Sequence, residues 1–468
     1  MRPITKADID RLRRKINRVE GGRMQPAPSA PHHSLAAGGF PSTVEEAKRL
    51  SDGAIALDDH SPGETADRSL HEAADGSRLG EDPRHYEADK LLDGEVVENP
   101  WGKYFLSEKF YPAHQRHGSI EISHLGELPG EWLGGISKGQ IPAHDPSRWA
   151  FLDTETTGLA GGTGTCAFLV GVGAIEDGGF RVRLFFMRDY DEEAAMLAGL
   201  AEFLRWYDVL VTYNGKAYDG PLLETRYRLA RKPFPLERMF HLDLLHGARQ
   251  LWKLRLQNCR LMELESEILG VLREGDLPGE LIPYYYFEYL RTRQAFRLVP
   301  LFHHNVMDIV SLACLTAVVL PAFASPADAR LRHGADLLGL ARWLRRSNQI
   351  EPALELYGRS IDAGLPDSEL FPALWESALL EKKLGRHDAK LALLLDLAGG
   401  KNPYRLSAYE ELAKHYERHA RHLELALQMT EAALEIEASE QLVRRKQRLA
   451  GRLQRQAEKS AKRLFQQV

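Results

Sequence analysis

Short apolar runs and longer helical patterns alternate over the middle of the chain. Gly178-Gly179 is typical of a hairpin turn between the second and third of these runs. Asp191 to Tyr207, which follows the third run, carries helical periodicity. The pattern therefore predicts three consecutive strands, a helix and a fourth strand within residues 148–325. The predicted strands are Trp149–Asp153, Ala167–Ala174, Phe180–Phe186 and Val209–Tyr213.

After Pro326 the pattern is helical to the C-terminus, and Ala353, Ala389 and Ala426 fall at matching places 36 and 37 residues apart. This spacing is close to the period of about 34 residues in tetratricopeptide (TPR) repeats. We expect an all-α, TPR-like helical-repeat domain over 326–468, which would either bind a protein partner or cap the preceding domain. The predicted helix pairs are Asp336–Ser347 with Pro352–Ala363, Phe371–Leu384 with His387–Leu397, and Leu406–His419 with Leu423–Ile436.

The last predicted helix, Gln441 to Gln467, is strongly basic and contains one acid, Glu458. Such a helix could follow a phosphate backbone, or it could be a solvated helix at the end of the chain.

The stretch from about Gly21 to Asn99 contains few large apolar side chains. Residues 5–20 predict a short helix, and the remainder of 1–99 is rich in Pro, Gly, Ser and Asp, which favours a largely disordered linker. The alternation in Trp101–Leu106 and Gly118–Ser123 predicts a strand-rich lead-in at 100–147 that packs against the following domain.

Composition narrows the class of protein. The 468 residues suffice for two or three domains, and the net charge of −5 gives no global signal for nucleic acid. The three cysteines are widely spaced, which argues against a disulfide framework or a zinc site. Met1 to Arg14 lacks the apolar core of a signal peptide, and the apolar run Ile309–Ala324 is short for a membrane span. We expect a soluble cytoplasmic protein with no membrane association.

Two carboxylates follow the first predicted strand directly. Because residues two apart in a strand point to the same side, Asp153 and Glu155 would project from one face. Such a pair suits Mg²⁺ or Mn²⁺, but a solvated turn after the strand explains it equally simply.

Two further acids begin predicted helices. Asp219 comes after the fourth strand and the Asn214-Gly215 turn, where it could cap the helix, face a site at the strand ends, or do both. Asp308 precedes an apolar helix and lies four residues after His304, a spacing that places both on one helix face.

Together these motifs resemble the DEDD exonuclease superfamily. The motifs are Asp153-x-Glu155, Asn214-x-x-x-Tyr218-Asp219 and His304-x-x-x-Asp308. The whole run is similar to the YprB-like ribonuclease H-like family, whose members often carry C-terminal helical repeats. The resemblance implies an α/β fold in which helices flank a ribonuclease H-like mixed sheet, over 148–325.

The resemblance also implies a site. Asp153, Glu155, Asp219 and Asp308 would hold two divalent cations, Mg²⁺ or Mn²⁺, that promote an in-line displacement. His304 would be the general base, with His303 as the alternative.

Other residues are implied as substrate contacts. Asn214 and Tyr218 would shape the pocket of the scissile nucleotide. Thr156 and Gly158 begin a Gly/Thr-rich segment that would line the path of the strand, where small residues permit close approach.

The function predicted is a metal-dependent 3′-5′ exonuclease that acts on a single strand or 3′ end of DNA or RNA. Two alternatives stay open. One is a nucleic-acid or protein-binding scaffold with a weak or silent nuclease site. The other is a structure-specific endonuclease.

Overall fold

The computed structural model describes Ala88 and residues 91–158, 164–273, 275–329 and 331–465, with side chains up to residue 459. The described residues belong to one compact unit, 82–468. The predicted helix at 5–20, and the predicted linker up to residue 87, lie outside the described residues.

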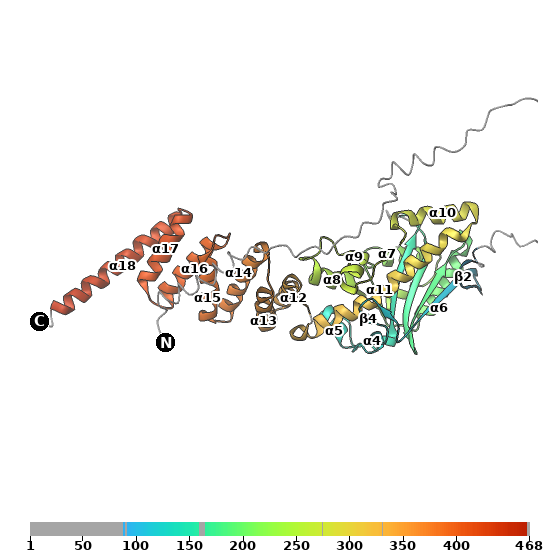
Figure 1. Cartoon of the computed structure of the whole chain (residues 1–468), viewed down its shortest axis with the longest axis horizontal. Helices are drawn as coiled ribbons and strands as arrows, with labels where there is room; N and C mark the ends of the chain where they lie inside the picture. The colour runs from blue at the N-terminus through green and yellow to red at the C-terminus, as the bar shows by residue number, and fades with distance from the viewer. Residues whose placement is uncertain (1–87, 89–90, 159–163, 274, 330, 466–468) are drawn as a thin grey trace, which may run out of the picture. The chain divides into compact units, whose positions relative to one another are not determined.

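A seven-stranded mixed sheet forms the core of the part of the protein that precedes the C-terminal helices (Figure 1). Its order is β1-β2-β7-β6-β5-β8-β9, with β8 and β9 parallel to β5 and the remaining neighbours antiparallel. This confirms the predicted α/β fold with a mixed sheet. The strands are β1 (Glu95–Asn99), β2 (Gly102–Pro112), β5 (Trp149–Thr156), β6 (Ala167–Glu176), β7 (Gly179–Phe186), β8 (Val209–Thr212) and β9 (Phe240–Asp243).

Helices cover both faces of the sheet, as neighbouring residues of β7 demonstrate. Phe185 packs against Phe203 of helix α6 (Glu193–Leu204) with ring centroids 5.8 Å apart. The next residue, Phe186, packs against Phe302 of helix α11 (Leu298–Ala324) with ring centroids 5.1 Å apart. Because successive strand residues point to opposite faces, α11 and α6 lie on opposite sides of the sheet.

Helix α11 crosses β6 at very short distance because β6 has glycine there. A Cβ atom at Gly171 would lie 1.9 Å from Oδ1 of Asn305, and one at Gly173 would lie 2.5 Å from Ile309. The close approach brings the polar residues of α11 to the same face as Asp153 and Glu155. In Figure 1, α11 (yellow) runs along the strands.

The sheet begins earlier than the sequence predicted. Residues 95–99, assigned above to the linker, form edge strand β1, and β2 is paired with β7 inside the main sheet. The strand-rich lead-in predicted at 100–147 thus contributes β2 to the main sheet itself. Only β3 (Arg116–His117) and β4 (Ile120–Glu121), among the described strands, form a small sheet of their own.

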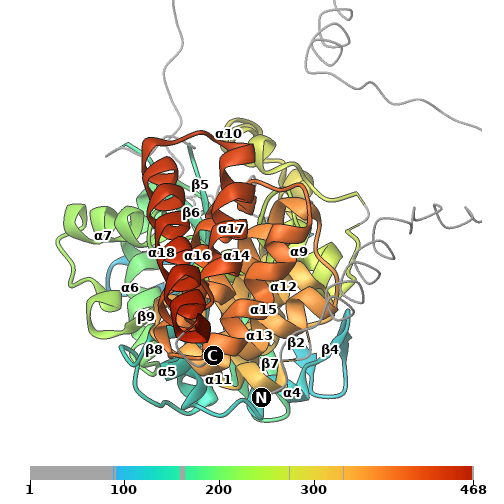
Figure 2. The ribbon, with the colours of Figure 1, turned by 90° about the vertical axis from the view of Figure 1, so that its left-hand side faces the viewer.

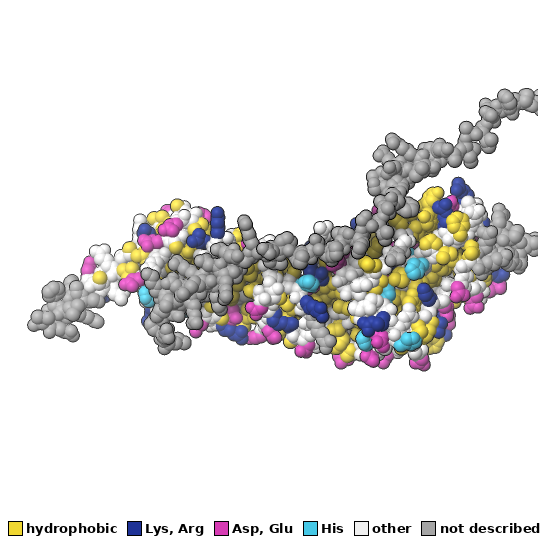
Figure 3. All heavy atoms as spheres, in the orientation of Figure 1, with side chains coloured by type: hydrophobic (Ala, Val, Ile, Leu, Met, Phe, Trp, Pro, Cys, Tyr) yellow, Lys and Arg dark blue, Asp and Glu magenta, His cyan; other side chains and the backbone are white. Residues whose placement is uncertain are grey.

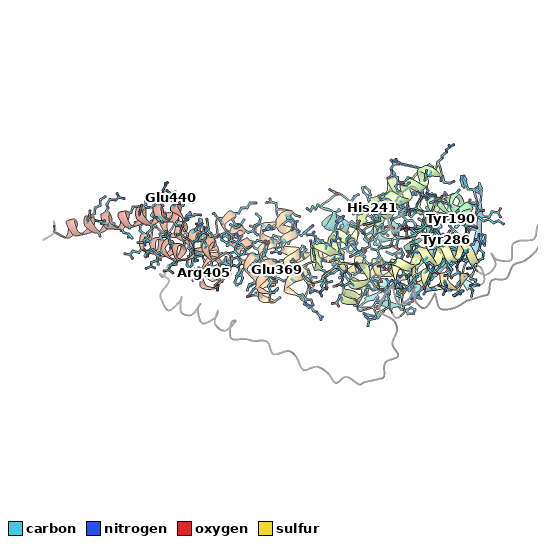
Figure 4. The ribbon with its side chains drawn as sticks, turned by 90° about the horizontal axis from the view of Figure 1, so that it is seen from above. Tyr190, His241, Tyr286, Glu369, Arg405 and Glu440 are labelled. Atoms are coloured by element: carbon cyan, nitrogen blue, oxygen red, sulfur yellow. The ribbon has the colours of Figure 1, made fainter. Side chains whose placement is uncertain are left out.

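Short helices and aromatic contacts complete this part of the molecule. Tyr190 and Tyr286 lie next to each other (Figure 4), with ring centroids 6.4 Å apart, and Tyr286 is fully buried. The other helices are α4 (Ser123–Gly126), α5 (Trp132–Ser137), α7 (Asp219–Leu229), α8 (Leu244–Trp252), α9 (Leu261–Leu264) and α10 (Ile282–Thr292).

The C-terminal part is helical, as predicted. Each helix packs on the next, and α17 and α18 lie side by side in Figure 2. Ala353 and Ala426 are buried but Ala389 is exposed, so the three alanines do not occupy equivalent positions. The TPR-like character stays a prediction. The helices are α12 (Gly334–Arg346), α13 (Ile350–Asp362), α14 (Asp367–Lys383), α15 (His387–Gly399), α16 (Arg405–Arg418), α17 (Leu423–Ile436) and α18 (Glu440–Phe465).

Within the described residues, one helical stretch, Ala295–Ala324, is long and apolar enough to cross a membrane. It is longer than the apolar run considered above, so length does not exclude a span. However, 72% of its most apolar window is buried inside the protein, as expected for a core helix.

Candidate active site

Asp153 and Glu155 project from the same face of β5, close to its C-terminal end. The amide of Asn305 on α11 donates to both carboxylates, at 2.9 Å to Asp153 and 3.4 Å to Glu155. Asp153 pairs with Gly171 in the sheet, the glycine that admits Asn305. Asn305 therefore joins the pair of acids to the helix that carries Asp308.

Asp219 is the first residue of α7, and its side chain does not cap the helix. Its carboxylate accepts a hydrogen bond of 2.5 Å from the hydroxyl of Thr154, the residue between the two β5 acids. The capping alternative is therefore wrong, since the helix begins after Tyr218. Burial raises the pKa of Asp219 to about 6, although the Thr154 hydrogen bond acts against the shift.

His304 and Asp308 both lie within α11, one turn apart. Asp308 therefore does not precede the helix, contrary to the sequence prediction. His304 Nε2 is 3.6 Å from Asp308 Oδ2. His303 is exposed and lines a separate hollow with Leu91 and Lys109, so it lies away from the four acids. Of the two histidines proposed above, the structure brings only His304 to the acidic cluster.

A buried arginine, Arg273, reaches this cluster from the segment between the π-helical turn Glu265–Leu269 and α10. Its Nη2 donates to Asp308 at 2.5 Å, its Nε to Glu265 at 2.6 Å and its Nη1 to Asp276 at 3.1 Å. Asp276 in turn lies within hydrogen-bonding distance of His304, with 2.9 Å between Oδ1 and Nδ1. These contacts were not predicted, because 35 residues of sequence separate Arg273 from Asp308, 28 separate Asp276 from His304, and no motif marks either residue.

The loop after β8 places Asn214 and Tyr218. Asn214 adopts a left-handed backbone with φ 68°, which asparagine tolerates better than most residues. Asp243, at the end of β9, accepts from the backbone N–H of Asn214 and of Lys216. Sequence reasoning missed Asp243 as the residue that shapes this loop. Tyr218 is 63% exposed and stands beside Asp219 at the start of α7.

Thr156 and Gly158 come directly after the β5 acids. The Thr156 hydroxyl donates to the Gly158 carbonyl at 2.9 Å, and a register shift interrupts β5 pairing between Glu155 and Thr156. Most of the Gly/Thr-rich segment that follows, residues 159–163, lies outside the described part of the chain.

The four acids strongly affect one another. Burial raises the pKa of Asp153 well above its usual value, and the charges of Asp308, Asp219 and Glu155 raise it further. Burial and the charge of Asp308 likewise raise the pKa of Glu155. Burial also raises the pKa of Asp308, against the opposing effect of Arg273. Reducing the negative charge of the cluster, by protons or by cations, is therefore favourable.

This donor set fits a hard divalent cation. Its carboxylates carry more negative charge than the single arginine can neutralise. Carboxylate oxygens are also the ligands that Mg²⁺ and Mn²⁺ prefer. Among the described residues, no three acidic, histidine or cysteine side chains already converge on one point as a metal site would require. Binding an ion would thus require side-chain adjustment.

Three comparisons show which known proteins this chain is similar to. The RNase_H superfamily model matches residues 150–320. YprB of Bacillus subtilis (strain 168) is 33% identical over 316 residues, which cover 66% of this chain and 75% of YprB. The family B DNA polymerase from Pyrobaculum calidifontis is similar with a TM-score of 0.31 and 16% identity, over 52% of this chain and 34% of the polymerase.

Proposed function

Because this chain belongs to the YprB-like family and carries a domain of the RNase H superfamily, we propose that it is a metal-dependent 3′-5′ exonuclease. Its reaction would be hydrolysis of phosphodiester bonds in DNA or RNA. The observation that carries the proposal is the buried cluster of Asp153, Glu155, Asp219 and Asp308. Burial raises the pKa of all four acids, and repulsion from the other acids raises the pKa of Asp153 and Glu155 further.

The four carboxylates would hold the metal ions. Two ions, Mg²⁺ or Mn²⁺, would neutralise the acids and stabilise the charge on the attacking and leaving oxygens. Asn305 would fix the β5 acids, and Arg273 would fix Asp308 through its hydrogen bond. The resulting charge stabilisation is the main chemical requirement of phosphodiester hydrolysis.

His304 would accept the proton of the attacking water. Its ring stands one helical turn from Asp308 and is held by Asp276, so it is already oriented beside the acids. The exposed Tyr218 would contact the terminal nucleotide, and the Asn214 loop would border its pocket. On the face shown in Figure 3, acidic and basic side chains are interspersed, so we expect phosphate contacts from individual residues.

The test is cleavage of end-labelled single-stranded DNA and RNA by the full chain with Mg²⁺ or Mn²⁺, beside Asp153→Ala. The proposal expects nucleotides to be released from the 3′ end by the wild type only. Equal cleavage by the variant would contradict the proposed site. No cleavage with either ion would contradict the proposed activity and leave the scaffold alternative. A circular single strand has no end, so its cleavage would favour the endonuclease alternative.

A further inference from the structure

The His304 ring lies between two carboxylates that contact different nitrogens. Both oxygens of Asp276 lie close to Nδ1, at 2.9 and 3.0 Å, whereas Nε2 is 3.6 Å from Asp308. An ionised carboxylate only accepts hydrogen bonds, so Nδ1 must carry the proton of the short contact. In a neutral ring, Nε2 is then the acceptor, and it faces the acidic cluster.

Asp276 is itself firmly held. Its oxygens accept from Arg273 Nη1 at 3.1 Å and from the backbone N–H of Leu277 at 2.9 Å, and its side chain is 9% exposed. Burial alone would raise the pKa of Asp276, but the bonds from His304 and Arg273 outweigh it and lower the pKa. Asp276 therefore stays ionised as an acceptor.

Arg273 ties this arrangement to the rest of the cluster. The same guanidinium contacts Asp276 and Asp308, which fixes the two carboxylates on either side of the His304 ring. Its third contact, Glu265, is fully buried and accepts from Ser311 of α11 at 2.7 Å. The segment that supplies Asp276 is thus bonded to the helix that supplies His304.

We propose that Asp276 is a positioning residue for His304, holding Nδ1 protonated and Nε2 exposed to the acidic cluster as the proton acceptor. The proposal rests on the proposed function, in which His304 receives the proton of the attacking water. The same division of labour, in which a carboxylate orients a histidine base, operates in hydrolases of unrelated fold.

The first test observes the ring directly, without catalysis. Long-range ¹⁵N–¹H NMR of the full chain reports which nitrogen carries the proton, at a pH where the ring is neutral, and His304→Gln assigns the signal. We expect Nδ1–H in the wild type and a loss of this tautomer in Asp276→Asn, because an amide can donate to Nδ1. An Nε2–H ring in the wild type, or an unchanged ring in the variant, would overturn the proposal.

The second test separates positioning from stability. Asp276→Asn should lower kcat by about 10²-fold, the lower end for a general base, with little change in KM. The matched control is Asp336→Asn, since Asp336 is also buried and accepts from an arginine, Arg255 at 2.9 Å, in another part of the chain. It should keep the wild-type kcat.

The outcomes distinguish the two proposals. If the wild type cleaves and Asp276→Asn has an unchanged kcat, the positioning role is wrong and the exonuclease stands. If the wild type cleaves nothing, the exonuclease is wrong, and the NMR tautomer still decides whether Asp276 orients the ring.

Discussion

The helical C-terminal part and the sheet-containing part differ in how the negative charge of a buried carboxylate is neutralised. On α16, Glu411 accepts hydrogen bonds from Lys382, Lys390 and Lys414 at 2.9 to 3.0 Å. Burial alone would raise the pKa of Glu411, but these lysines lower it to about 2. In the sheet-containing part, Asp153 and Glu155 have raised pKa values and accept from a neutral amide.

The difference indicates which acids serve structure and which await a ligand. A carboxylate whose charge is already neutralised by cationic side chains of the same chain needs no further ligand. Four carboxylates around one arginine are an unfavourable arrangement in the absence of a cation, and such perturbed groups are typical of functional sites.

The largest expected effect is on activity. Asp308→Asn should reduce phosphodiester cleavage by about 10³-fold or more, since the charge stabilisation lost is worth several kcal/mol. The measurement is the single-turnover rate on an end-labelled strand. The matched control is Asp328→Asn, an exposed carboxylate outside the site, and a similar loss in both variants would contradict the assignment.

The acids themselves were predictable, whereas their partners were not. Strand periodicity placed Asp153 and Glu155 on one face, and motif spacing singled out Asp219 and Asp308, because these signals are local in sequence. Asn305 lies inside the third motif, yet its role depends on how closely α11 crosses Gly171.

Other features depend on contacts that no local pattern encodes. The guanidinium of Arg273 reaches Asp308 across 35 residues of sequence. The edge strand β1 was missed for a related reason: Glu95–Asn99 is mostly exposed, so it lacks the apolar run that marks a buried strand.

The next effect concerns stability in the helical part. Glu411→Gln should lower the free energy of unfolding by about 2 kcal/mol, because it leaves the buried Lys390 without its anionic partner. Denaturant unfolding measures the change, and nuclease activity should be unaffected. An unchanged unfolding midpoint would show that Glu411 is dispensable.

The two regions should respond to pH in opposite directions. In EDTA, Asp219, with a pKa raised from 3.8 to about 6, makes the protein less stable as pH rises through that range. Glu411, with a pKa lowered from 4.5 to about 2, makes it less stable as pH falls through its own range. We expect the titration of Asp219 to change the free energy of unfolding by on the order of 1 kcal/mol, because proton binding is distributed over the neighbouring acids. Asp219→Asn should flatten the first slope, and a wild-type slope of the opposite sign would contradict the account.

The smallest effect is expected on α18. Arg448 and Arg452 both pair with Glu417, so part of its basic charge is neutralised within the chain. Arg455→Gln combined with Lys459→Gln should weaken binding of single strands by about threefold or less. Fluorescence anisotropy over a range of salt concentrations measures the affinity for single strands. The double variant Arg448→Gln with Arg452→Gln is measured for comparison. A loss of about tenfold would instead make α18 a nucleic-acid contact.

The central claim is that the acidic cluster is completed by a divalent cation, and thermal unfolding with and without Mg²⁺ tests it most directly. We predict that Mg²⁺ raises the Tm of the wild type. We further predict that Asp153→Asn raises the Tm in EDTA, because repulsion falls, and abolishes the rise with Mg²⁺. The claim would be contradicted if Mg²⁺ left the Tm of the wild type unchanged and if Asp153→Asn were less stable than the wild type in EDTA.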